Sequence, residues 1–242
     1  MEAKTPAIEG HRVVAHDEWI EARRALLARE KELTRLREDV ARLRRALPWE
    51  KVAKAYAFDT DSGRRTLAGL FGPHSQLVVY HFMFHPDWDE GCKSCSFWAD
   101  NYDGIDVHLA QRDVAFLAVS RAPLAKLKAY RARMGWSFAW VSSFGSDFNH
   151  DFGVSFTPGE QASGSAFWNY ERQRVPVTEM PGVSVFFKDA AGQVFHTYSC
   201  YARGLDPMNG AYQVLDLVPK GRDEAGLAYP QAWVKRHDEY GG

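Results

Sequence analysis

The sequence predicts an α/β fold in which strands alternate with helices. Residues 77–84 and 113–120 are β-favouring apolar runs of the kind found in strands covered on both faces. A helix between them and a second helix, with Pro123 in its first turn and Gly135 at its end, lead to a third strand at residues 136–141. Such alternation requires right-handed crossovers and a largely parallel sheet.

Composition limits the classes of partner. A chain of 242 residues, 45% apolar, can bury one sizeable core. Lys and Arg number 30 against 31 Asp and Glu, so no positive field would attract nucleic acid or an anionic membrane. Residues 1–7 lack a signal-peptide pattern, and no apolar run approaches the ~20 residues of a membrane span. We therefore expect a cytoplasmic protein, in which three cysteines do not form a disulfide framework.

Residues 17–47 are predicted to form one long helix, because apolar residues recur at alternating steps of three and four. Arg29 interrupts this seam, and Pro48 follows it as a stop signal. The chain then divides into a helical extension, residues 1–48, and a domain, residues 49–242. The helix either packs on its own domain or forms a homodimer, which would make the protein a redox-regulated interaction module. The seam comprises Trp19, Ala22, Leu26, Leu33, Leu36, Val40, Leu43 and Leu47.

The remaining elements follow from turn and cap signals. Residues 53–59 and 64–70 flank a turn-rich segment and predict a hairpin. A helix is expected from Cys92 to about residue 108, and residues 142–174 read as an irregular, aromatic-rich insertion. Residues 183–188 and 193–199 predict a second hairpin. Asp206-Pro207 is expected to begin a last helix, followed by a tail along the surface.

The segment Gly91-Cys-Lys-Ser-Cys-Ser96 places a CxxC dithiol at the start of a predicted helix. Unsatisfied backbone amides at a helix N-terminus stabilise a thiolate, and two intervening residues let Cys95 reach Cys92 and close a disulfide. Lys93 favours the thiolate, whereas the acidic residues at positions 87, 89 and 90 oppose it. The sign of the net pKa shift does not follow from the sequence.

The order of strand, loop, CxxC, helix, strand, helix and hairpin is that of a thioredoxin-like fold, a three-layer sandwich. In that fold Met180-Pro181 takes the place of the cis-proline turn that faces the dithiol. By analogy Cys92 is the attacking thiolate, Cys95 is the resolving thiol, and Pro181 shapes the substrate face. The sequence thus predicts a thiol-disulfide oxidoreductase without a cofactor, acting on a disulfide in a protein or a small molecule.

A soft-metal site is an alternative use of the cysteines. His81, Met83 and His85 alternate along the strand that leads to Cys92 and Cys95, so one histidine with the two thiols would suit copper or zinc. A structural zinc site needs four ligands, and no second CxxC or paired histidine motif follows. Packing of these side chains in the core is the simpler interpretation.

Other residues have two interpretations each. Arg121 follows a parallel strand at the edge where α/β sheets bind ligands, so it would line a substrate cleft with Trp88, Lys93 and Trp136. In the second interpretation, which is equally consistent with the sequence, Arg121 forms a structural ion pair and the tryptophans pack in the core. Cys200 ends the last predicted strand and reads as a small core residue, with a resolving role as the alternative.

Several separate motifs occur in order along nearly the whole chain. They are Gly91 to Ser96, Ser120-Arg-Ala-Pro123, Arg133-Met-Gly-Trp136, Ser142-Ser143 with Asp147-Phe-Asn149, and Phe195-His-Thr-Tyr198 with Ala202-Arg-Gly204. Together they resemble one bacterial thioredoxin-like family, described as domain of unknown function 899. The resemblance implies a dithiol-disulfide oxidoreductase or isomerase. Residues 66–71 and 138–154 are also similar to peroxiredoxin-like proteins, but the peroxidatic pattern PxxxTxxC is absent, because Trp88 and Cys92 stand where Pro and Thr would be.

Overall fold

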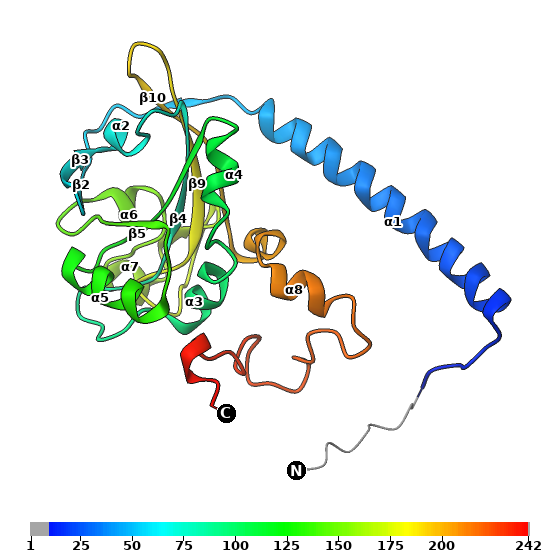
Figure 1. Ribbon diagram of the computed structural model, residues 1–242. Coiled ribbons are helices and arrows are strands. Elements are labelled where there is room, and N and C mark those ends of the chain that lie inside the picture. The colour runs from blue at the N-terminus through cyan, green and yellow to red at the C-terminus, as the bar shows by residue number, and fades with distance from the viewer. Residues whose placement is uncertain (1–9, 242) are drawn as a thin grey trace. The chain divides into compact units, whose positions relative to one another are not determined.

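The computed structural model describes residues 10–241, which form two units divided between Leu47 and Pro48. The first unit contains α1 (His16–Arg45), shown in Figure 1. It has acidic residues in its first turn and basic residues in its last, as the helix dipole favours. None of its residues is buried. No helix within residues 10–241 is both long enough and apolar enough to cross a bilayer.

The second unit is built on one sheet (Figure 1). Its strands are β1 (Glu50–Lys51), β2 (Ala57–Thr60), β3 (Gly63–Thr66), β4 (Gln76–His81), β5 (Val114–Ser120), β6 (Ala139–Ser142), β9 (Gly182–Lys188) and β10 (Val194–Tyr201). They lie in the order β1-β10-β9-β4-β5-β6-β2-β3. The β4, β5 and β6 strands are parallel, and the other neighbouring pairs are antiparallel. The strand before the dithiol, β4, therefore lies inside the sheet with partners on both sides.

Helices cover both faces of this sheet. They are α2 (Leu67–Leu70), α3 (Lys93–Ala99), α4 (Asp106–Ala110), α5 (Leu124–Met134), α6 (Phe148–Asp151) and α8 (Gly210–Leu215), with short 3₁₀ turns η1 (Ala202–Met208) and η2 (His237–Glu239). Successive residues of β4 point to opposite faces, so Tyr80 packs with α3, α5 and α8 while Val79 packs with α2 and α6. This arrangement confirms the predicted three-layer, thioredoxin-like fold.

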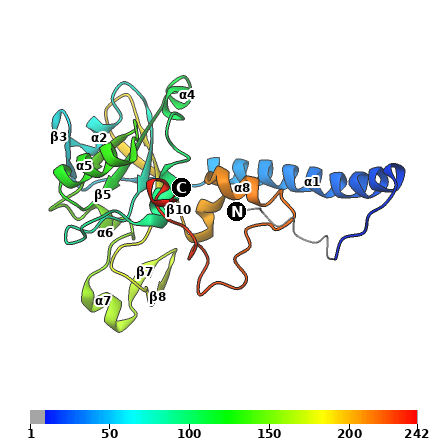
Figure 2. The same ribbon diagram turned by 60° about the horizontal axis from the view of Figure 1, so that its bottom comes forward.

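The aromatic-rich insertion has structure of its own. It contains α7 (Pro158–Ser163) and a small hairpin of β7 (Ala166–Trp168) and β8 (Glu171–Gln173), shown in Figure 2. Thr157 caps α7 through a reciprocal hydrogen-bond pair with Glu160. A small core of Phe156, Ala166 and Val175 holds the insertion together, with Trp168 packed against it.

Two helices have bounds that differ from those predicted. The helix expected from Cys92 to residue 108 is interrupted between α3 and α4, where Gly104 has a φ of 81°. Asp103 in this turn accepts hydrogen bonds from Ser137 N at 2.6 Å and Ser137 Oγ at 2.7 Å, which fix the interruption. The last helix begins later than expected: residues 206–207 lie in η1, and the side chain of Asn209 caps α8 instead. By contrast, α5 begins after Pro123 and ends before Gly135, as predicted.

A buried polar chain crosses the sheet on the face opposite the dithiol. His81 Nε2 lies 2.8 Å from Ser184 Oγ, which lies 2.8 Å from Ser199 Oγ, which in turn lies 2.7 Å from His196 Nε2. The His81 ring packs beside Phe148. Burial lowers the pKa of His81 from 6.5 to about 3, so this imidazole is neutral in the folded protein at neutral pH.

This burial predicts how stability varies with pH. The unfolded chain protonates His81 below about pH 6.5 and the folded chain only near pH 3, so the free energy of unfolding should fall as pH drops through that window. The contribution is at most about 1.4 kcal/mol per pH unit. Urea unfolding of wild type and His81→Gln should show a shallower pH dependence in the variant. His108→Gln, at an exposed position, is the control, and equal slopes for wild type and His81→Gln would contradict the assignment.

Candidate functional site

One residue, Met83, contacts both cysteines of the CxxC segment. The Met83 carbonyl accepts a hydrogen bond from Cys92 N at 3.1 Å, and Met83 N donates one to Cys95 Sγ at 3.5 Å. Met83 lies two residues after β4, and the intervening Phe82 N still donates to Val119 O on β5. The two cysteines are therefore held directly against the end of a central strand.

The two thiols differ in exposure. Cys92 is the residue before α3 and is partly exposed, whereas Cys95 lies in the first turn of α3 and is 2% exposed. Ser96, also buried, donates from N and Oγ to the Cys92 carbonyl at 3.0 Å each. Tyr80 Oη donates to the Cys95 carbonyl at 3.2 Å. These bonds fix the first turn of α3, with Cys92 partly exposed and Cys95 enclosed.

The acidities of the two thiols differ for the same reasons. A hydrogen bond from the Cys95 thiol, assisted by the backbone amides of Cys95 and Ser94 and by the charge of Arg236, lowers the pKa of Cys92 from 9 to about 7, against the opposing effect of burial. Burial, and then the neighbouring Cys92 sulfur, raise the pKa of Cys95 well above its usual value. At neutral pH the pair therefore presents one substantially ionised sulfur and one protonated thiol.

Gly91, just before the dithiol, occupies a position with no room for a side chain. A Cβ atom there would lie 2.8 Å from Phe82 Cε1 and 3.0 Å from Tyr130 Cε1. Both rings belong to the core beneath α3 and α5. Close packing of the backbone against these rings is the physical reason for glycine in the Gly-Cys-x-x-Cys segment.

The C-terminal segment supplies a guanidinium group at the dithiol. Arg236 donates to the Gly91 carbonyl at 2.9 Å and to Tyr130 Oη at 2.7 Å, and Tyr130 Oη lies 2.9 Å from Ser96 Oγ. Arg236 also pairs with Glu90 at 2.9 Å. The role of Arg236 could not be predicted from the sequence, because 145 residues separate it from Gly91 and no local pattern marks it.

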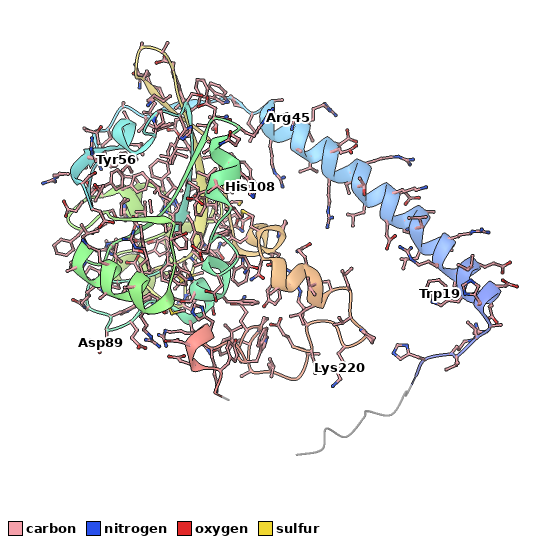
Figure 3. The ribbon with its side chains drawn as sticks, viewed as in Figure 1. Trp19, Arg45, Tyr56, Asp89, His108 and Lys220 are labelled. Carbon is pink, nitrogen blue, oxygen red and sulfur yellow. The ribbon has the colours of Figure 1, made fainter. Side chains whose placement is uncertain are left out.

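The acidic residues upstream of the dithiol are neutralised or face solvent. Glu90 forms ion pairs with Arg133 at 2.5 Å and Arg236 at 2.9 Å. The Asp87 side chain is 88% exposed, and Asp89 lies on the surface loop before α3 (Figure 3). The structure thus resolves the sign that the sequence left open: the pKa of Cys92 is lowered.

A cavity of about 730 Å³ lies beside Cys95. Its arginines are paired with aspartates, since Arg222 contacts Asp206 at 2.9 Å and Asp216 at 2.8 Å, and Glu224 accepts a hydrogen bond from Tyr212 Oη at 2.8 Å. The walls near the dithiol are mainly apolar and aromatic. They include Tyr80, Met83, Trp98, Trp168, Met180 and Pro181.

Pro181 lines this cavity, but its peptide bond differs from the expectation. No cis peptide bond occurs within residues 10–241, so the predicted cis Met180-Pro181 turn is wrong. Met180 N donates to Val154 O at 2.9 Å, and Glu179 pairs with Ser155 in an antiparallel bridge. This pairing leads the chain in an extended conformation into β9. The proximity of Pro181 to the dithiol does not require the cis bond.

The four residues predicted to line one cleft do not lie together in the structure. Trp136 is 6% exposed within a cluster of aromatic rings, which corrects the prediction for this residue. Lys93 Nζ donates to Ala232 O at 3.3 Å and is directed to the C-terminal segment. Trp88 packs against the core, and its carbonyl accepts from a lysine on α5. Arg121 binds the buried Glu179 at 2.7 Å and lines a second cavity of about 420 Å³ with His85.

The geometry disfavours the soft-metal alternative. The His81 ring faces the side of the sheet opposite Cys92 and Cys95, where it lies 2.8 Å from Ser184 Oγ and packs beside Phe148. Within residues 10–241 no group of three or more His, Cys, Asp or Glu side chains is placed to hold a metal ion. The third cysteine, Cys200, is 8% exposed and packs in the same core cluster as Cys95, as expected of a small core residue.

The sequence matches a protein family, and the fold is similar to those of solved structures. The chain matches a family described as "Bacterial protein of unknown function (DUF899)" over residues 8–240, and no curated protein matches it. Among solved structures, Peroxidoxin BcpB from Mycobacterium tuberculosis is 12% identical with a TM-score of 0.44, and the match covers 69% of this chain and 96% of that one. A Peroxiredoxin Q of Xanthomonas campestris is 16% identical with a TM-score of 0.43, covering 68% and 98%.

The charge of Arg236 should affect the reactivity of the dithiol. Arg236→Met removes a positive charge that favours the Cys92 thiolate, so the pKa of Cys92 should rise towards its usual value and alkylation at neutral pH should slow. The pH dependence of iodoacetamide alkylation measures this pKa. Arg131→Met is the matched control, because Arg131 lies on α5 and pairs with Asp61 instead. An unchanged alkylation midpoint in Arg236→Met would contradict the role of Arg236.

The packing at Gly91 predicts a cost in stability. Gly91→Ala forces the new methyl group against Phe82 and Tyr130, and overpacking of this kind lowers the free energy of unfolding by about 1–3 kcal/mol. Urea denaturation measures the change. Gly226→Ala is the control, since no atom lies within 4 Å of a Cβ there. Equal stability of the two variants would mean that the rings yield without strain.

Proposed function

The chain belongs to the DUF899 family of bacterial proteins of unknown function, and we propose that its activity is thiol-disulfide exchange by Cys92 and Cys95. One observation carries the proposal. The two cysteines lie one helical turn apart and the pKa values of their thiols are shifted in opposite directions: that of the partly exposed Cys92 is lowered to about 7, and that of the buried Cys95 is raised. Thiolate attack needs an ionised, reachable sulfur, and resolution needs a second thiol in reserve.

The proposed reaction has two exchange steps. The Cys92 thiolate attacks one sulfur of a substrate disulfide, forming a mixed disulfide and releasing the other substrate sulfur as a thiolate, which takes up a proton. Cys95 then loses its proton and attacks the Cys92 sulfur, which forms the Cys92–Cys95 disulfide and releases the second substrate thiolate. Two electrons pass from the protein to the substrate. The reverse sequence oxidises a dithiol substrate.

The cavity beside Cys95 indicates the class of disulfide. Its arginines are paired with aspartates, and Trp98, Met180 and Pro181 offer an apolar surface beside Cys95. Trp168 adds an aromatic side chain to the lining of the cavity. We therefore propose disulfides carried by apolar or aromatic groups. Peroxide reduction is not proposed, because the PxxxTxxC pattern is absent.

Cysteine variants separate the two steps. Cys92→Ser should reduce the exchange rate with an aromatic disulfide to that of the buffer, because the nucleophile is lost. Cys95→Ser should complete only the first step and accumulate a mixed disulfide at Cys92, which intact-protein mass spectrometry detects. Cys200→Ser is the control and should exchange normally. Undiminished exchange by Cys92→Ser would refute the proposal.

A further inference from the structure

Helix α1 carries an apolar stripe that its own unit leaves exposed. The side chains project from all round the helix in Figure 3, where Trp19 and Arg45 mark its ends. None of its residues is buried, and Leu33 and Leu36 are 47% and 59% exposed. A 30-residue helix in a globular protein normally gains its stability by packing an apolar face. An apolar stripe of this length therefore indicates a binding surface.

The stripe has the spacing of a two-stranded coiled coil. Over about four heptads, and a length of about 45 Å at 1.5 Å per residue, apolar residues occupy the a and d positions with one exception. The exception is Arg29 at a d position. The a positions are Trp19, Leu26, Leu33 and Val40, and the d positions are Ala22, Arg29, Leu36 and Leu43.

The residues flanking the stripe differ in charge between its two sides. Three of the four g positions are acidic, Glu18, Glu32 and Asp39, and the fourth is Ala25. The e side is mainly basic, with Arg23, Glu30, Arg37 and Arg44. Charges at e and g set partner choice and orientation in coiled coils. The separation of signs therefore carries information about what binds the stripe.

A second copy of the helix satisfies this charge pattern in one orientation. In a parallel pair, each g residue lies against the e residue five positions later on the partner helix. An antiparallel pair would instead place the acidic side against itself and the basic side against itself, which is unfavourable. The parallel arrangement brings together Glu18 with Arg23, Glu32 with Arg37, and Asp39 with Arg44.

We propose that α1 binds α1 of a second copy of this chain as a parallel, in-register coiled coil. Within one chain, Glu32 already pairs with Arg29, and Asp39 with Arg42 at 3.3 Å. These pairs are exposed on both sides, and exposed ion pairs contribute little to stability, so the same carboxylates are available across an interface.

Arg29 specifies the register of the pair. In register, the two copies of Arg29 share one layer, beside Glu30 and Glu32 of each helix, whose charges offset theirs. A shift by one heptad would place each guanidinium against Leu36 or Ala22 and remove it from that environment. A single polar residue in an apolar seam is a known means of fixing register at some cost in stability.

Charge reversal on the full-length protein tests partner, orientation and register together. Sedimentation equilibrium should show a dimer. Glu32→Arg alone, or Arg37→Glu alone, sets like charges against each other across the parallel interface and should weaken dimerisation on the order of tenfold. The double variant restores opposite charges across the interface and should bind several-fold more tightly than either single variant, with incomplete recovery because Glu32 no longer offsets Arg29. Glu38→Arg and Lys31→Glu, at outward-facing f positions, are the matched controls.

The outcomes distinguish the proposal from its rivals. A monomer at all concentrations would overturn it and leave the stripe to a different protein. A dimer in which Glu32→Arg and the double variant weaken association equally would overturn the parallel orientation. Leu36→Asp, which places a charge in the seam, should dissociate the dimer. Its near-ultraviolet circular dichroism reports whether the second unit remains folded, and a persistent dimer in this variant would also contradict the proposal.

Discussion

The backbone of Met83 holds the dithiol in place, and the rest of the site depends on it. Its carbonyl accepts a hydrogen bond from Cys92 N and its N–H donates one to Cys95 Sγ, so a single residue positions both ends of the CxxC turn. Met83 can do this because β4 is paired with β5 on one side and β9 on the other. The sulfurs are thus fixed by a part of the core that opens only with the whole domain.

The two thiols differ in acidity because this fixed geometry gives them different surroundings. Cys95 points into the core and keeps its proton, whereas Cys92 lies at the edge and gains hydrogen bonds and a positive charge. The charge comes from Arg236, which a chain of contacts through Tyr130 and Ser96 links to the first turn of α3. Acidic residues near the sulfurs do not cancel this effect, since the carboxylate of Glu90 is already bound by two guanidinium groups.

Local sequence patterns were sufficient to predict the helices, the strands and the position of the dithiol. They were insufficient to predict which side chains surround the dithiol. Strand runs, the Pro123 and Gly135 signals and the CxxC spacing are short-range features, and the structure contains the elements they predict. The face on which His81 lies is different, because it depends on where α3 packs. Tyr80 on β4 packs with α3, so its neighbour His81 lies on the opposite face of the sheet, away from the sulfurs. The periodicity of the strand alone does not say which face α3 covers.

Two further features depended on contacts between remote segments. Burial of Trp136 is set by Phe82, just after β4, and by rings from β6 and α5, and the cavity beside Cys95 is lined by residues between α8 and the C-terminus. That segment was expected to be a tail along the surface. Its contacts with Gly91 and Tyr130 are specific pairings of single side chains, which leave no repeating signal.

The most direct test of the account is the redox titration of the Cys92–Cys95 pair in glutathione buffers, with the disulfide mapped by mass spectrometry. The account predicts one two-electron transition, in which the intramolecular disulfide replaces both thiols. The ratio of disulfide to dithiol should change tenfold for every change of about 30 mV in the buffer potential. Cys92 and Cys95 remaining reduced across the whole range, or a disulfide to Cys200 in their place, would contradict it.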